Sequence, residues 1–262
     1  MSKHAAKKHF GQHFLHDAEV IDRILRAVDP QPDDHFVEIG PGLGALTIPL
    51  IARLPRLTVV ELDRDVLPHL KKGCGAQLPK LTVIEADALT VDYSALAAPG
   101  KKLRLIGNLP YNISTPLLFH LLDHADAVQD MHFMLQKEVV DRMCAEPDDN
   151  HYGRLTVTLA ARGQCQNLFA VAPTSFDPPP KVDSAIVRVT PRAAGFAMPD
   201  SAAFEKLVTV AFSQRRKTLG NALKTLLDAD AIRAAGVDPG ARAETLAPEA
   251  FGRLTQQLLA RS

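Results

Sequence analysis

Residues 107–114 read Gly-Asn-Leu-Pro-Tyr-Asn-Ile-Ser and combine an amide, a turn-forming proline and an aromatic ring. Such a set can hold a flat nucleobase. The amide oxygen of Asn108 or the carbonyl of Leu109 can accept from an exocyclic amine, and the Tyr111 ring can stack on the base. Pro110 stiffens the turn between them. The alternative is a plain Asn-x-Pro turn with a packed tyrosine, and the eight residues alone leave both interpretations open.

Three earlier motifs could bind a nucleoside-containing cofactor. Gly40 and Gly42, in Gly-Pro-Gly-Leu-Gly, let the backbone approach a ligand closely. Their spacing differs from the dinucleotide fingerprint, which disfavours NAD. Glu61 follows about 20 residues later, where a carboxylate can accept both hydroxyls of a ribose. Asp87 can accept from the exocyclic amine of an adenine. A surface ion pair for Glu61 and a helix cap for Asp87 are the structural alternatives.

Each of these motifs follows a short apolar run that predicts a buried strand. Because parallel strands end at one edge of an open α/β sheet, we expect the four motifs to meet there. Helical patterns separate the strands, which predicts a doubly wound, mostly parallel seven-stranded sheet whose last strands can pair antiparallel. The expected strands are residues 35–39, 57–61, 81–85, 103–106, 131–135, 168–171 and 185–190. The expected helices between them are residues 17–28, 45–54, 63–72, 115–122 and 137–144.

The character of the chain changes after Pro191. Residues 191–199 are rich in proline, alanine and glycine and predict a linker. Helical periodicity without any strand pattern follows at residues 203–212, 217–227 and 249–259. The sequence therefore predicts a small C-terminal helical domain.

The composition limits the class of protein. Three scattered cysteines give no disulfide framework or zinc ribbon, and the first residues have no apolar core for a signal peptide, so we expect a cytoplasmic protein without a membrane span. Formal net charge is zero, so any RNA must be held by local basic patches. Two are visible, Lys7-Lys8 and Arg215-Arg216-Lys217, although each can also be a solvated face. His9, His13 and His16 suggest metal spacing, but Gly11 interrupts the helix, and we expect no metal.

The motif set resembles the ribosomal RNA adenine dimethyltransferases, which use S-adenosylmethionine, and within them the small-subunit (16S) branch. The resemblance extends from residue 8 to about residue 218, and the remaining helices match mainly in character. The matching stretches are residues 8–15, 37–44, 60–64, 107–115, 134–138, 152–155, 176–184 and 214–218.

The resemblance implies a Rossmann-like methyltransferase domain over residues 1–195 and a helical RNA-binding domain over residues 196–262. It also assigns roles to particular residues. Gly40 and Gly42 would line the methionine part of the cofactor, Glu61 would bind its ribose and Asp87 its adenine. Asn108 would contact both the cofactor and the target amine.

Further roles follow from the same resemblance. His13 and Leu15 belong to a segment that closes over the cofactor, and the family usually has Asn where this chain has His13. Tyr111 would stack on one face of the target base, in the turn with Leu109 and Pro110, and Phe176, which precedes a run of three prolines, would clamp the base elsewhere. Arg215, Arg216 and Lys217 would hold RNA phosphates.

The implied function is transfer of methyl groups to the N6 amines of two adjacent adenines in a hairpin loop near the 3′ end of 16S rRNA. The partner would be the small ribosomal subunit or its precursor, and the enzyme a monomer. Three alternatives stay open: a large-subunit rRNA adenine methyltransferase of the resistance type, a non-catalytic RNA-binding assembly factor, and an NAD oxidoreductase. The glycine spacing disfavours the last of these.

Overall fold

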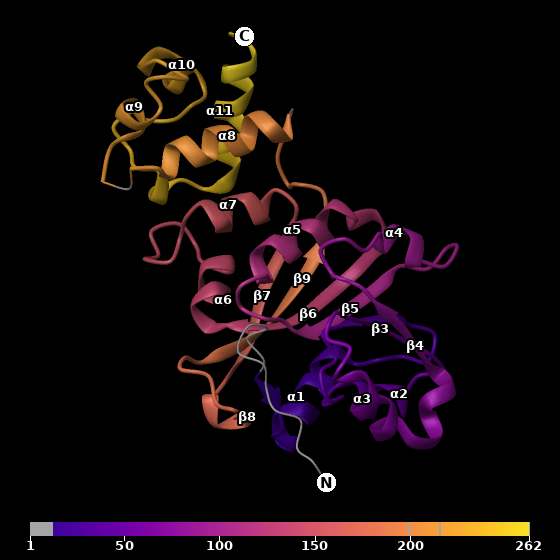
Figure 1. Cartoon of the computed structure of the whole chain (residues 1–262). Helices are drawn as coiled ribbons and strands as arrows, with labels where there is room; N and C mark the ends of the chain where they lie inside the picture. The colour runs from indigo at the N-terminus through magenta and orange to yellow at the C-terminus, as the bar shows by residue number, and fades with distance from the viewer. Residues whose placement is uncertain (1–12, 199, 215, 262) are drawn as a thin grey trace. The chain divides into compact units, whose positions relative to one another are not determined.

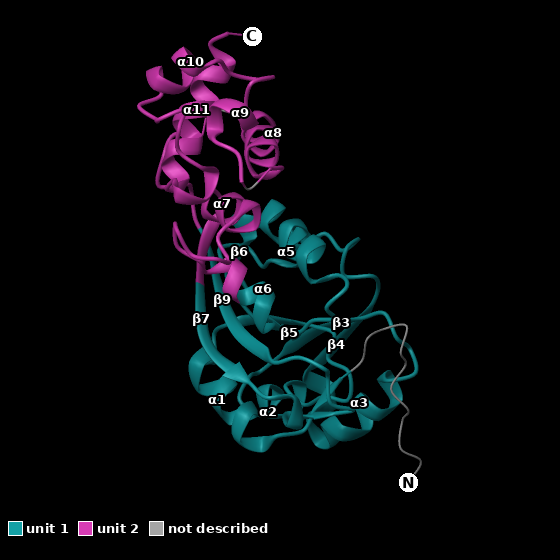
Figure 2. Cartoon of the chain, turned by 90° about the vertical axis from the view of Figure 1, so that its left-hand side faces the viewer, with its two compact units in different colours: residues 1–140, 166–191 teal, residues 141–165, 192–262 magenta. Residues whose placement is uncertain are grey.

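The structure is a computed structural model that describes residues 13–198, 200–214 and 216–261 (Figure 1). Arg215 and the basic and histidine residues of positions 1–12 therefore lie outside the described residues. The chain forms two compact units, residues 1–140 with 166–191 and residues 141–165 with 192–262 (Figure 2). Within the described ranges, no helix is both long and apolar enough to cross a bilayer.

The first unit is built on the predicted seven-stranded sheet, with strand order β4-β3-β2-β5-β6-β9-β7. Neighbours from β4 to β6 pair in parallel, and β9 pairs antiparallel with β6. The doubly wound α/β fold and the late antiparallel strand are thus confirmed. The strands in sheet order are Leu81–Glu85, Leu57–Glu61, His35–Ile39, Leu103–Asn108, Val128–Gln136, Ser184–Pro191 and Gly163–Val171.

Figure 1 shows helices α1, α2 and α3 on one side of this sheet and α4 and α5 on the other. Buried apolar side chains of α1 and α2 join those of the central strands in one hydrophobic core. The Asp17 carboxylate caps α1, as predicted, by accepting from the backbone N–H groups of Glu19 and Val20. The bounds are α1 Ala18–Val28, α2 Thr47–Ile51, α3 Leu67–Cys74, α4 Tyr93–Leu96, α5 Ser114–Asp123 and α6 Lys137–Met143.

Two helices differ from the expected ranges for local reasons. Helix α3 starts at Leu67, not at residue 63, because Asp63 accepts from the N–H of Asp65 in a turn and Pro68 favours the first helical turn. Helix α2 has five residues, not ten, and ends two residues after Pro49.

A buried ion cluster stabilises the end of the sheet at which β2, β5 and β6 begin. The Arg104 guanidinium lies 2.7 Å from the Asp34 carboxylate and 2.8 Å from that of Asp130, and the three side chains are between 8 and 15% exposed. Arg104 also covers the Phe36 ring at 4.9 Å. The cluster ties β5 and β6 to the loop before β2.

The second unit is helical and has its own core. It contains α7 (Arg154–Ala160), α8 (Ser201–Phe212), α9 (Leu219–Ala222), α10 (Ala229–Ala234) and α11 (Pro248–Leu259). Tyr152 is 1% exposed and donates to the Leu246 carbonyl at 2.7 Å, so residues 141–165 pack with the C-terminal helices. The predicted division into a methyltransferase domain and an RNA-binding domain after residue 195 stays a prediction. The compact units differ from it, because residues 141–165 belong to the second unit.

The expected helix over residues 217–227 was wrong in length. Only α9, Leu219–Ala222, is helical there, because Thr218 bridges to Arg242 and the N–H groups of the next two residues bond to the segment 239–241. Helix α10, which lacks a strong periodic pattern, was not predicted.

Candidate functional site

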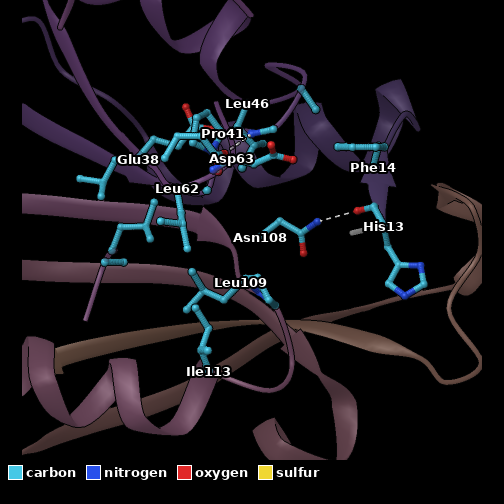
Figure 3. A pocket seen from close by; sticks show the side chains of 18 of the residues that line it. His13, Phe14, Glu38, Pro41, Leu46, Leu62, Asp63, Asn108, Leu109 and Ile113 are labelled. Atoms are coloured by element: carbon cyan, nitrogen blue, oxygen red, sulfur yellow. Dashed lines mark hydrogen bonds between the residues drawn. The ribbon is translucent and has the colours of Figure 1, made fainter. Parts of the chain in front are cut away.

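A cavity of about 370 Å³ opens where β2, β3, β4 and β5 end (Figure 3). Its size suits a nucleoside-sized ligand. The strand-end motifs meet here, as their order along parallel strands predicted. The predicted site residues that line it are His13, Leu15, Gly40, Gly42, Glu61, Asp87, Asn108, Leu109, Pro110 and Tyr111.

The glycine turn forms one wall of the cavity. Gly40 and Gly42 have φ values of +66° and +54°, a region that other residues rarely adopt. A Cβ on Gly42 would lie 3.2 Å from the Phe14 ring, so a larger residue would push against the opposite wall. The turn therefore leaves backbone, not side chain, facing the ligand space.

Glu61 is held by this turn. One of its carboxylate oxygens accepts from the Gly42 N–H at 3.3 Å and the other from the Asp63 N–H at 2.8 Å. Burial raises the pKa of Glu61, and these N–H groups oppose that rise by stabilising the ionised form. The carboxylate is thus fixed in orientation at the end of β3.

Glu38, at the end of β2, is a site residue that the sequence analysis did not single out. It is 2% exposed and accepts from the Thr47 hydroxyl at 2.6 Å. Burial raises the pKa of Glu38 to about 8, with a smaller contribution from the nearby Glu61 carboxylate and against the hydrogen bond from Thr47, which lowers it. The available signal was a carboxyl two residues before Gly40, but the apolar strand pattern around it predicted a core position.

Asp87 follows β4, and the helix cap that was the structural alternative for it is wrong, because the next helix, α4, begins at Tyr93 and is capped by Asp92. One oxygen of the Asp87 carboxylate accepts from the Leu89 N–H at 2.9 Å within a turn. The residue also lines the cavity. With Asp63, four acidic side chains line the cavity, of which Glu38 keeps its proton at neutral pH, whereas the described lining residues include no lysine or arginine. The cavity is therefore acidic in a chain whose formal net charge is zero.

The Asn108 loop lies beside the glycine turn, because β5 pairs with β2 and a Cβ on Gly40 would lie 3.7 Å from the Asn108 carbonyl. Gly107 is required there, because a Cβ would fall 2.3 Å from the Ile39 carbonyl of β2. The Asn108 amide nitrogen donates to the His13 carbonyl at 3.0 Å, which leaves the amide oxygen directed toward the cavity (Figure 3). The Leu109 N–H bonds to the Met134 carbonyl at 3.2 Å and fixes the start of the turn.

Tyr111 follows Pro110 in this turn and lines the cavity with its ring half-buried. Its hydroxyl lies 2.9 Å from the Ser184 hydroxyl, and its ring stacks on that of His13 with centroids 6.1 Å apart. Burial raises the pKa of Tyr111. The ring is thus held at its tip and across one face, as a stacking platform requires.

The N-terminal segment reaches the site through a small second sheet. Strand β1 (Phe14–Leu15) pairs antiparallel with β8 (Phe176–Asp177). Phe14 lines the cavity and was missed, because two residues carry no periodic pattern. Phe176 is 3% exposed and packs in the core beside Leu15, so the structure does not bring it into the cavity. Its stacking role stays a prediction that this conformation does not support.

The predicted RNA-binding residues lie in the helical unit. Arg216 and Lys217 are exposed in the turn after α8. Among the residues that the structure describes, no three histidine, cysteine or acidic side chains form a metal-binding group.

The comparisons with known proteins agree on one family. The model of the family "Ribosomal RNA adenine dimethylase" matches residues 3–259. The chain is 56% identical to a "Ribosomal RNA small subunit methyltransferase A" of Chromobacterium violaceum, over 98% of this chain and 97% of that protein. Identity to the protein of the same name from Pseudomonas aeruginosa is 51%, over 98% and 96%.

Two solved structures share the fold and a quarter of the sequence. A dimethyladenosine transferase from Plasmodium falciparum superposes with a TM-score of 0.78 at 26% identity, covering 92% of this chain and 96% of that one. The 23S rRNA methyltransferase ErmE superposes with a TM-score of 0.73 at 27% identity, covering 94% and 99%.

Proposed function

Since the chain belongs to the ribosomal RNA adenine dimethylase family, we propose that it dimethylates the N6 amines of two adjacent adenines near the 3′ end of 16S rRNA. The target is a hairpin loop in the small subunit or its precursor, the methyl donor is S-adenosylmethionine, and the enzyme acts as a cytoplasmic monomer. The observation that carries the proposal is the meeting of four strand-end motifs around one acidic cavity.

The residues present fit the cofactor. The positive φ values of Gly40 and Gly42 leave room that a Cβ would fill, as the methionine part requires. The anchored Glu61 carboxylate can accept from ribose hydroxyls, and Asp87 from the adenine amine. S-adenosylmethionine supplies a methyl group on a positively charged sulfonium. An acidic lining favours such a cation and opposes a pyrophosphate, which is a further argument against NAD.

The Asn108 loop would position the target amine. Adenine N6 is a poor nucleophile because its lone pair is delocalised into the ring. The Asn108 amide oxygen and the Leu109 carbonyl would accept its two hydrogens, which favours a pyramidal, more nucleophilic nitrogen. Holding this nitrogen in line with the methyl group would lower the activation barrier by several kcal/mol, which is the usual contribution of proximity and orientation in enzymes. No strong base is needed, since the proton can leave after transfer.

Tyr111 would stack on the adenine once the base has left its own stack. Stacking on an aromatic side chain is worth about 1–3 kcal/mol per base, which is comparable to the cost of unstacking. The exposed Arg216 and Lys217 would bind RNA phosphates outside the cavity.

The alternatives within the class differ in the RNA they act on. Identity of 51–56% to proteins named for the small subunit, against 27% to ErmE, favours the small-subunit substrate. A non-catalytic assembly factor would have no need for an anchored Glu61 and an Asn108 oxygen aimed at the cavity.

The test is transfer of labelled methyl groups from S-adenosylmethionine to immature small subunits, followed by mass mapping of the modified nucleosides. We expect two adjacent dimethyladenosines. Transfer only to large-subunit RNA would favour the resistance type, and binding without transfer would favour the assembly factor.

Two variants test the assigned roles. We expect Asn108→Ala to lower kcat at least tenfold and Glu61→Ala to weaken cofactor binding about tenfold or more, each with an intact circular dichroism spectrum. Asn167→Ala, on the exposed surface of β7, is the matched control. Wild-type rates in Asn108→Ala would refute its role.

A further inference from the structure

The imidazole of His13 points away from the cofactor side of the cavity. Figure 3 shows the ring projecting away from Pro41 and Asp63, while the backbone of His13 stays beside Asn108. The contacts of the ring are with two other loops. Its Nδ1 lies 2.7 Å from the Pro178 carbonyl, and its plane is inclined by only 27° to the Tyr111 ring.

These contacts determine which nitrogen of the His13 ring carries a hydrogen. A carbonyl oxygen only accepts, so Nδ1 carries a hydrogen and donates it to Pro178. Nδ1 is therefore committed to the loop after β8. The backbone carbonyl of His13 is likewise committed to the Asn108 amide. One residue thus connects the N-terminal segment, the Asn108–Tyr111 turn and the loop at Pro178.

We propose that His13 is a positioning residue for the target base: its imidazole holds the Tyr111 ring and the Pro178 loop in place and does not bind the cofactor. The inference rests on the proposed function only in identifying the base as an RNA adenine. It changes the role expected for His13, because the contact with the cofactor side is made by its backbone.

Histidine at position 13 can make a contact that asparagine cannot. The resemblance implies Asn at this position, and an amide could still donate to the Pro178 carbonyl. An amide cannot offer an aromatic face to Tyr111. With histidine the Tyr111 ring is restrained both by the Ser184 hydroxyl and by the imidazole. A ring that is ordered before the base arrives loses less entropy on binding, which strengthens binding of the base.

Two substitutions separate the two contacts. His13→Asn keeps a hydrogen-bond donor and removes the ring, whereas His13→Phe keeps the ring and removes the donor. We expect His13→Asn to raise the KM for the RNA substrate about three- to tenfold while the Kd for S-adenosylmethionine changes less than twofold. We expect His13→Phe to recover part of that loss, because it restores the ring contact with Tyr111 but not the bond to Pro178. A weaker cofactor Kd with an unchanged RNA KM, or no change in either constant, would overturn the proposal.

A second measurement needs no methyl transfer. The chain has three tyrosines and no tryptophan. Tyr93 and Tyr152 are at most 1% exposed, and their rings contact His120 and His124 in the first case and Phe212 in the second. In protein labelled with ¹³C at the tyrosine rings, we expect His13→Asn to shift the Tyr111 signal alone, with Tyr111→Phe identifying that signal. An unmoved Tyr111 signal would refute the contact. If wild-type protein transfers no methyl group, the proposed function fails, and this spectrum still decides whether His13 positions Tyr111.

Discussion

Glu38 gives the cofactor cavity a proton that the unfolded chain would not keep at neutral pH. The pKa of Glu38 rises from 4.5 to about 8 because the carboxyl is buried. Below pH 4.5 the folded and unfolded chains both bind this proton. As the pH rises toward 8, only the unfolded chain releases it, so the folded state loses stability over this range. At about 1.4 kcal/mol for each pKa unit, the total loss is about 5 kcal/mol.

The perturbation that tests this is Glu38→Gln, which keeps the size of the side chain and an oxygen for the Thr47 hydroxyl. Between pH 6 and pH 9 we expect the wild type to lose about 3 kcal/mol more unfolding free energy than the variant. Urea unfolding without cofactor, followed by far-ultraviolet circular dichroism at both pH values, measures the difference. Glu85→Gln, which changes an exposed carboxylate at the end of β4, two strands away from β2, is the matched control.

The refuting result is equal loss of stability in the wild type and in Glu38→Gln. Glu38 would then already be ionised in the cavity, and burial would not control its proton. A positively charged ligand should favour the ionised form, so calorimetry at pH 7 in buffers of different ionisation enthalpy should detect release of about one proton per S-adenosylmethionine bound. Glu38→Gln should abolish most of that release.

Three further predictions follow from other parts of the chain. Gly107→Ala should lower the free energy of unfolding by about 3 kcal/mol or more, because its Cβ would overlap a backbone carbonyl, whereas Gly195→Ala has open space and should change the thermal midpoint little. Arg104→Leu should cost about 3–5 kcal/mol in urea unfolding, because it leaves its two aspartate partners buried without a cation. Replacing Arg216 and Lys217 together by alanine should weaken RNA binding and reduce the slope of log affinity against log salt by up to about 2, measured by titration at several salt concentrations.

The cofactor side of the site was predictable from the sequence because each of its parts is local. A short apolar run predicts a buried strand, and the residue after it lies at the strand end. Parallel pairing then places such ends at one edge, so Glu61, Asp87 and Asn108 could be expected to meet before any contact was known. They do line one cavity.

The substrate side was less predictable because it depends on contacts between distant segments. The antiparallel pair of Leu15 with Phe176 joins two strands of two residues each, and strands this short show no periodicity. The same pairing buries Phe176, which the sequence suggested as a base clamp. Nor does any local pattern indicate that His13 would bond to the carbonyl of Pro178.

The acidic cavity and the basic surface residues differ in charge, so they suit different parts of an RNA, the base and the phosphates. Three carboxylates and the protonated Glu38 line the cavity, and the described residues around it include no lysine or arginine. A phosphate would be repelled there, whereas a sulfonium and an uncharged base would not. Under the proposed function, an RNA would enter with its base alone, and its backbone would be held by cations outside the cavity, for which we propose Arg216 and Lys217. Such a division would allow a chain of zero net charge to bind both a polyanion and the cationic cofactor that we propose.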